Sequence, residues 1–169
     1  LADAGKKKGK PAARAKQKSI EVKTVEEDLK LVVYNNGVRT VVDPLSTATR
    51  DVSYCWSSMS PDKTKLLFVA GNDAYVSDLN GKNLIHLGTI HAPVWRGNDY
   101  VVGMCDEDDG HQFTASDIVI IKAQKGAMPQ QLTPVSGEIK MYPSVSEDGN
   151  KIAYHTTDGK LYVMTIKEK

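Results

Sequence analysis

The feature that most constrains this chain is an internal repeat. The stretch "SMSPDKTKLLFVAGNDAYVSDLNGKNLIHL", from Ser58 to Leu87, returns in looser form as "SVSEDGNKIAYHTTDGKLYVMTI" from Ser144. Asp62 then aligns with Asp148, 86 residues further on, and this offset is two periods of about 43 residues. A repeat of that length predicts a fold assembled from copies of one small unit.

A degraded middle copy lies between the two. Pro93-Val94-Trp95 stands for its first strand, "DYVVG" from Asp99 for the second, and "DIVIIKAQKGAMPQQLT" from Asp117 for the third and fourth. The segment "CDEDDGHQFTAS" is inserted between the second and third strands, and insertions of this kind form exposed loops. Each unit is thus four short strands in about 40 residues, the period of a β-propeller blade.

The local pattern is that of an all-β chain. Apolar runs are short and alternate with period two, and no sustained stripe with a 3.6-residue period occurs. "LKLVVYNNGVRTVVDP" predicts a hairpin around Asn36-Gly37, and a last hairpin is predicted around Asp158-Gly159. Because one sheet cannot bury both of its faces, we expect the units to stack as blades.

The chain divides into a tail and one domain. Residues 1–19 are rich in Lys, Ala, Gly and Pro, and we interpret them as a flexible basic tail, with a surface anchor for anionic polymer or lipid as the alternative. Residues 20–169 are interpreted as a β-propeller domain. It comprises a partial N-terminal unit at 20–50 and three blades of four antiparallel strands at about 53–90, 91–134 and 138–167.

Composition excludes some classes of function. The net charge of +1 argues against nucleic acid as a partner, and no segment has the ~20 apolar residues of a membrane span. Cys55 and Cys105 are too few for a disulfide scaffold, and we expect two buried small side chains. A single bridge between neighbouring repeats in an oxidising compartment stays open.

At its repeats the chain resembles the TolB-type, WD-like β-propeller repeats of bacteria, over roughly residues 53–166. Their blade reads approximately proline-x-tryptophan-serine-proline-aspartate-glycine, followed by lysine and an apolar strand. The matching residues of this chain are Trp56, Ser60, Pro61 and Asp62 in the first copy, Trp95 in the second, and Asp148, Gly149 and Tyr162 in the third. These residues are expected to hold the fold: proline and aspartate set a tight turn, with aspartate accepting from an amide two residues on, and the aromatic rings fill space between blades.

Propellers of this class usually have six or more blades, which leaves three arrangements open. The chain forms a compact four-blade ring, or part of a longer propeller, or a half-ring that completes itself as a homodimer. The second arrangement is favoured. In each, the last unit ends after its third strand, and a closing strand could come from "IEVKTVE" or "VRTVVDP" near the N-terminus.

Few residues suggest chemistry. The sequence has neither a Gly-x-Ser-x-Gly nucleophile elbow nor a phosphate-binding Gly-x-x-x-x-Gly-Lys loop, and its four histidines show no metal-ligand spacing. We therefore expect neither catalysis nor a cofactor or metal. Trp56 and Trp95 are expected in the core.

The most polar cluster is Asp106, Glu107, Asp108, Asp109 and His111. Its spacing differs from that of an EF-hand, so we interpret it as an exposed acidic loop, with a partner-binding loop as the functional alternative.

The sequence thus predicts a non-catalytic β-propeller scaffold for protein–protein interaction. Ala2-Asp3-Ala4 has the form that a signal peptidase accepts, which favours a periplasmic or otherwise extracytoplasmic location. The resemblance implies an envelope protein as partner. Two alternatives stay open: a carbohydrate- or peptide-binding propeller, and an accessory propeller domain of a larger peptidase-like enzyme.

Overall fold

The protein is all-β. A computed structural model describes residues 21–108, 110–111 and 113–167, so the predicted tail at 1–19 lies outside the described residues. No helix occurs in the described part of the chain. The described strands are β1 (Val22–Glu27), β2 (Lys30–Asn35), β3 (Val38–Val42), β4 (Cys55–Met59), β5 (Lys65–Ala70), β6 (Asp73–Asp78), β7 (Ile85–Gly88), β8 (His91–Arg96), β9 (Tyr100–Asp108), β10 (Phe113–Lys122), β11 (Gln130–Gln131), β12 (Lys140–Val145), β13 (Lys151–Thr156) and β14 (Leu161–Thr165).

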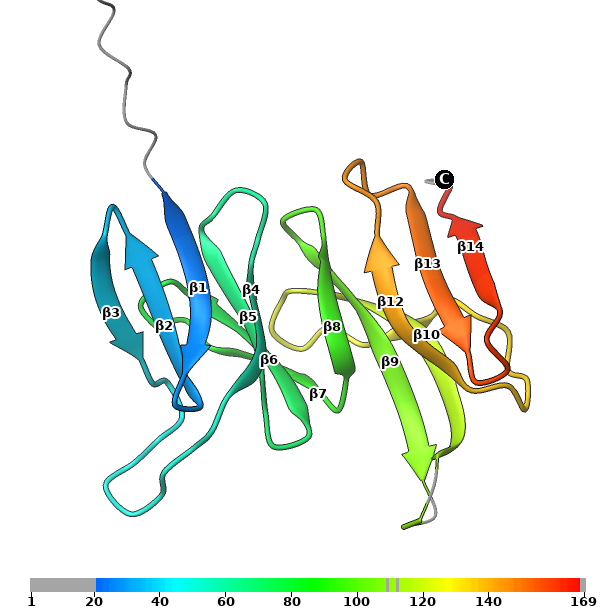
Figure 1. The fold of residues 1–169 in the computed structure, drawn as a ribbon, viewed down its shortest axis with the longest axis horizontal. Coiled ribbons are helices and arrows are strands. Elements are labelled where there is room, and N and C mark those ends of the chain that lie inside the picture. Colours follow the sequence, from blue (N-terminus) through cyan, green and yellow to red (C-terminus); the bar gives the residue numbers. More distant parts are fainter. Residues whose placement is uncertain (1–20, 109, 112, 168–169) are drawn as a thin grey trace, which may run out of the picture.

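These strands form four antiparallel sheets, each a simple meander. Their strand orders are β1-β2-β3, β4-β5-β6-β7, β8-β9-β10-β11 and β12-β13-β14. The sheets stand side by side in an open row in chain order, with β1–β3 at one end and β12–β14 at the other (Figure 1). The first strands of neighbouring sheets contact one another, β1 with β4, β4 with β8 and β8 with β12. This side of the row, made by β1, β4, β8 and β12, is called the first-strand face.

The predicted closing strand is wrong. The segments "IEVKTVE" and "VRTVVDP" supply β1 and β3, and both pair with β2 within the first sheet. The reason is local: the Asn36-Gly37 turn folds β3 back onto β2, and Gly37 has the positive φ of 82° that such a turn requires. The first and last sheets therefore remain apart at opposite ends of the row, and a compact four-sheet ring is not formed (Figure 1).

Three apolar clusters hold the row together, one at each junction between sheets. Alternate residues of a strand point to opposite neighbours, as period two requires. Leu66 and Phe68 of β5 pack toward the first sheet, whereas Leu67 and Val69 pack toward the third. Val102 and Ile118 of the third sheet meet Ile152 of the fourth in the last cluster.

A repeated turn joins the first two strands of the second and fourth sheets. In the second sheet Ser60 Oγ donates to Asp62 at 2.6 Å and accepts from Lys65 N at 3.0 Å. In the fourth sheet Ser146 Oγ donates to Asp148 at 2.6 Å and accepts from Lys151 N at 2.9 Å. The predicted hydrogen bonds, in which the aspartate accepts from an amide two residues on, are present. Asp62 accepts from Thr64 N at 3.1 Å, and Asp148 accepts from Asn150 N at 3.0 Å.

Two details differ from the sequence analysis. The insertion at 105–116 mostly lengthens the β9–β10 hairpin, because pairing continues with Asp106 opposite Ser116 and Glu107 opposite Ala115. The strand registers also make Trp95 of β8 equivalent to Met59 of β4. Met59 pairs with Leu66 near the start of β5, and Trp95 pairs with Val101 at the equivalent place in β9. Trp56 therefore stands three residues before the position that the blade pattern assigned to it.

Candidate functional site

The first-strand face carries the same backbone irregularity three times. The ladder register shifts between Cys55 and Ser58 in β4, between His91 and Val94 in β8, and between Met141 and Ser144 in β12. The second residue of each bulge has a positive φ: 55° at Trp56, 45° at Ala92 and 50° at Tyr142. Such angles are strained for residues other than glycine, and bulges of this kind re-aim a side chain.

The bulges bring two aromatic rings together across the middle sheet. Trp56 and Tyr142 stack with their centroids 6.2 Å apart and an interplanar angle of 18°, although β4 and β12 belong to different, non-adjacent sheets. The equivalent residue of the sheet between them is Ala92, whose small side chain leaves room for the contact. The prediction that Trp56 lies in the core is wrong, because 51% of Trp56 and 49% of Tyr142 are exposed.

Two hollows flank this aromatic pair. One has a volume of about 260 Å³, and its lining includes Trp56, His91, Ala92, Met104 and Tyr142. The other has a volume of about 660 Å³ and is lined by Glu26, Cys55, Trp56, Ser57, Ser58, Met59, Pro93, Val94 and Trp95. Both include Cys55 and Trp56, so they form one surface along β4 and β8, called the first-strand groove.

The groove combines an apolar lining with a few polar atoms. Trp95 packs against the cluster between the second and third sheets, as predicted, but its ring also forms part of the groove wall. Its Nε1 and the hydroxyls of Ser57 and Ser58 are buried and have no hydrogen-bond partner among the described residues. Glu26 of β1 accepts from Ser57 N at 2.6 Å, and this bond joins the first sheet to β4 beside the groove.

A histidine of the groove is fixed by a buried carboxylate. His91 Nδ1 lies 2.5 Å from Asp106 Oδ1, and the Asp106 side chain is only 3% exposed. Asp106 therefore does not belong to an exposed acidic loop, and this part of the prediction is wrong. The pair spans the β8–β9 ladder, in which His91 is opposite Met104, so sequence spacing alone gave no sign of it.

The rest of the predicted acidic loop does not assemble into a site. Glu107 is exposed in β9, Asp108 ends that strand, and His111 is exposed in the turn beyond it. Asp109 lies outside the described residues. Within the described ranges, no three His, Cys, Asp or Glu side chains are arranged to hold a metal ion.

Neither cysteine has the lowered pKa that is typical of a reactive thiol. Burial, followed by the charge of Glu26, raises the pKa of the Cys55 thiol, and burial together with nearby carboxylates raises that of Cys105. Both thiols thus stay protonated at neutral pH, when attack requires the thiolate. Both residues are exposed and unbridged, which corrects the expectation that they are buried.

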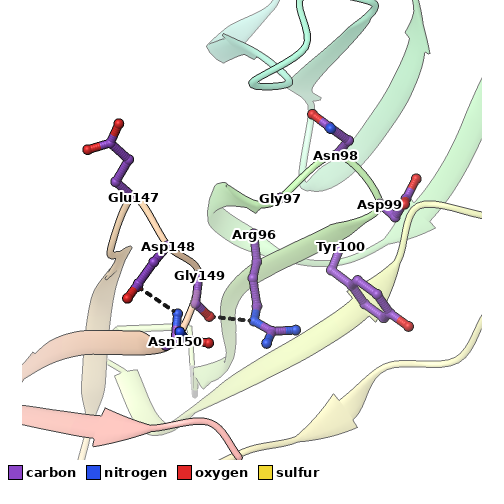
Figure 2. A pocket seen from close by; sticks show the side chains of 9 residues that line it. All are labelled: Arg96, Gly97, Asn98, Asp99, Tyr100, Glu147, Asp148, Gly149 and Asn150. Carbon is purple, nitrogen blue, oxygen red and sulfur yellow. Dashed lines mark hydrogen bonds between the residues drawn. The ribbon is translucent and has the colours of Figure 1, made fainter. Parts of the chain in front are cut away.

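A third hollow, between the turns of the third and fourth sheets, is a structural joint. Figure 2 shows Arg96 reaching across it, with Arg96 Nε donating to Gly149 O at 2.8 Å, while Glu147 and Asp99 point away from Arg96. The turns of the second and third sheets are joined similarly, since Asp62 N donates to Asn98 Oδ1 at 2.9 Å. The structural residues Asp62 and Gly149 thus lie at contacts between neighbouring sheets.

Comparison with known proteins adds no relative. No family model matches the chain, and no curated protein matches its sequence. The described part of the chain also has no helix of the length and apolar character that crossing a bilayer requires.

The sequence analysis missed Ala92, Tyr142 and His91. A signal was available, because all three lie in the first strands of the repeat units. The repeat units were aligned on the motif of the repeated turn, and that alignment does not show that their first strands bulge at equivalent positions.

Proposed function

We propose that the four sheets are successive blades of a propeller-type arrangement and that the protein is a non-catalytic scaffold. The proposed partner is another protein, bound in the first-strand groove. The observation that carries this proposal is the half-exposed Trp56–Tyr142 pair, which repeated backbone bulges hold at the surface. Proteins rarely expose two large stacked rings beside apolar hollows unless the surface binds something.

The composition of the groove favours a protein over a charged ligand. Tryptophan and tyrosine are the residue types that most often dominate protein interfaces, with apolar neighbours excluding water around them. Met59, Pro93 and Val94 supply such neighbours here. Glu26 is the one carboxylate among the lining residues of the two hollows, so neither a nucleic acid nor a polycation is favoured.

Carbohydrate is the second candidate. A flat, exposed ring such as that of Trp56 can stack on a sugar, and the carboxylate residue Glu26 lines the same hollow. Export, and an envelope protein as the partner, rest on the TolB-type resemblance and remain proposals.

The test compares peptide and glycan arrays probed with fluorescently labelled protein. The informative variant is Trp56→Ala with Tyr142→Ala, which removes both rings. A matched control is Met128→Ala, which truncates an exposed apolar side chain outside the groove. Peptide binding that the double variant loses and the control keeps supports the proposal. Glycan binding with the same pattern supports the second candidate, and binding unaffected by the double variant contradicts both.

A further inference from the structure

His91 brings a ring nitrogen to the smaller hollow of the first-strand groove. Its Nδ1 lies 2.5 Å from Oδ1 of the buried Asp106, whereas one third of the His91 side chain is exposed. The two nitrogens of an imidazole point in diverging directions, so Nε2 points away from Asp106. His91 lines the hollow of about 260 Å³, and its Nε2 forms no hydrogen bond with the described residues. Nε2 is therefore the atom of His91 that a ligand in this hollow can use.

Asp106 determines what this nitrogen can do. A carboxylate only accepts hydrogen bonds, and a carboxyl group is a stronger acid than an imidazolium, so the proton of the contact belongs to His91 Nδ1. A neutral imidazole carries one proton, and its other nitrogen then holds an unshared electron pair. In the neutral form of His91, Nε2 is thus an acceptor and cannot donate. A ligand in the hollow has to supply the donor.

The remaining walls of the hollow suit one flat apolar ring. Val69, Ala92 and Met104 line it together with the rings of Trp56 and Tyr142. Aromatic rings attract one another in offset and edge-to-face arrangements, and a methionine sulfur contacts ring edges favourably. The volume of about 260 Å³ lies below the roughly 300 Å³ at which pockets for small-molecule ligands begin. The hollow therefore fits a single side chain better than a larger ligand.

Tryptophan is the side chain that matches both the ring-shaped space and the fixed acceptor. Phenylalanine has no donor and the tyrosine hydroxyl both donates and accepts, whereas the indole N–H only donates. Tryptophan is also among the residues that most often anchor an interface by filling a pocket. We propose that this hollow receives a tryptophan side chain of the partner, whose indole N–H donates to His91 Nε2. This inference rests on the proposed function, because it names the partner residue that the same groove binds.

The test pairs a tryptophan probe with a copy that lacks the donor. N-acetyl-tryptophanamide carries the indole N–H, and its β-(3-benzothienyl)alanine analogue keeps the ring shape with sulfur in place of that group. Each is titrated to about 10 mM, which covers the weak binding of a single side chain. Nitrogen-15 NMR of the His91 ring is recorded at about pH 8, above the ordinary pKa of imidazole. It identifies the protonated nitrogen and shows a shift when Nε2 accepts a hydrogen bond.

The spectrum of the free protein should place the proton of His91 on Nδ1. The tryptophan probe should shift the Nε2 resonance and bind about three- to tenfold more tightly than the analogue, as expected for one hydrogen bond. Asp106→Asn keeps the shape of the side chain but can donate as well as accept, so it should narrow this preference. Asn72→Ala and Tyr142→Phe remove the other side-chain oxygens that line the hollow, and both should keep the preference.

Three results would overturn the inference. One is a proton on Nε2 of the free protein, and another is equal binding, or no binding, of the two probes to the wild type. The third is loss of the preference in Asn72→Ala or Tyr142→Phe, which would assign the acceptor to that residue. The wild-type comparison decides even where Asp106→Asn does not fold.

Failure of the proposed function would look different. A peptide from the arrays that binds the groove through a residue other than tryptophan keeps the proposed function and overturns this inference. Binding of the tryptophan probe at His91, with no peptide that depends on Trp56 and Tyr142, supports the recognition of indole and contradicts the proposed function.

Discussion

At the scale of single residues, left-handed backbone positions decide which side chains the turns accept. Gly149 and Lys63 occupy the same place in the repeated turn, with φ of 73° and 61°. A Cβ at Gly149 would meet Arg96 Cγ at 3.6 Å, an ordinary contact, so the cost of a side chain there comes from the backbone alone. The equivalent turn of the second sheet already bears that cost at Lys63.

Gly149→Ala should therefore lower the free energy of unfolding by about 1–2 kcal/mol, the usual penalty for a left-handed non-glycine residue. Lys63→Gly is the matched control and should not destabilise the protein, because it relieves the same strain. Urea denaturation measures both variants. An equal loss in the two would show that strain does not decide the choice of residue.

The Asp43 carboxyl makes stability sensitive to acid. Burial opposes its ionisation, but hydrogen bonds from Tyr54, Ser46 and Lys30 outweigh burial and lower its pKa to about 2. The unfolded chain, with a pKa near 3.8, binds the proton first. Stability from this group is thus present above about pH 4 and is lost as the pH falls toward 2.

Tyr54→Phe removes the 2.5 Å hydrogen bond to Asp43 and should raise the folded pKa toward its ordinary value. The variant should be less stable at pH 6 and should lose less further stability between pH 4 and 2 than the wild type. Urea midpoints across this range measure the difference. Asp158, whose pKa is also about 2, contributes equally to both proteins. Parallel pH profiles would contradict the assignment to Asp43.

The sequence predicted some of these residues because their interactions are local. The bonds of Asp62 and Asp148 reach amides two residues away, so the motif alone specifies them. The His91–Asp106 pair joins residues fifteen positions apart, and only the β8–β9 ladder brings them together. Contacts of that kind depend on register, which sequence periodicity leaves undetermined by a residue or two.

At the scale of elements, the three bulged strands place very different side chains at one backbone position. Trp56 and Tyr142 are half exposed, whereas Ala92 is buried in the cluster between the third and fourth sheets. The same position is thus a surface site in β4 and β12 and a packing site in β8.

Ala92→Phe should destabilise the protein by about 1–3 kcal/mol, because the new ring must displace the Trp56–Tyr142 stack or crowd the cluster between the third and fourth sheets. Tyr142→Ala removes a ring at the equivalent position of β12. Because this ring is half exposed, the loss of unfolding free energy should be less than about 1 kcal/mol. Urea denaturation compares the two, and tryptophan fluorescence reports loss of the stack on Trp56. A larger cost for Tyr142→Ala would mean that the stacked pair supports the fold.

The strands themselves were largely predictable. Alternating apolar residues and the Asn-Gly turn specify the hairpins, and the repeat specifies their number in each unit. Trp56 was misplaced because a bulge adds a residue to one strand only, and a pattern of apolar residues cannot show where that residue lies. The acidic insertion was predicted as a loop from its composition, yet continued pairing with β10 keeps Asp106 and Glu107 in a strand.

At the scale of the whole molecule, the open row predicts a gradient of local stability. The second and third sheets have neighbours on both sides, whereas the first and fourth are each packed against one sheet (Figure 1). A sheet with one neighbour loses fewer buried contacts when it unfolds locally than a sheet with two. Its amide protons therefore exchange faster.

Native-state hydrogen exchange at low protein concentration should therefore find the slowest amides in β5, β6 and β9, and faster exchange in β13 and β14. Equally slow exchange in all four sheets of a single chain would contradict the gradient.

The joints between turns have a consequence for how such a chain can grow. Each joint, whether Asp62 to Asn98 or Arg96 to Gly149, uses only residues of two adjacent sheets. Neither of these joints involves a third sheet among the described residues, so neither depends on the total number of sheets. Duplication or deletion of one unit within its gene would therefore change the span of the protein while leaving the remaining joints intact, and the number of sheets is free to vary by whole units.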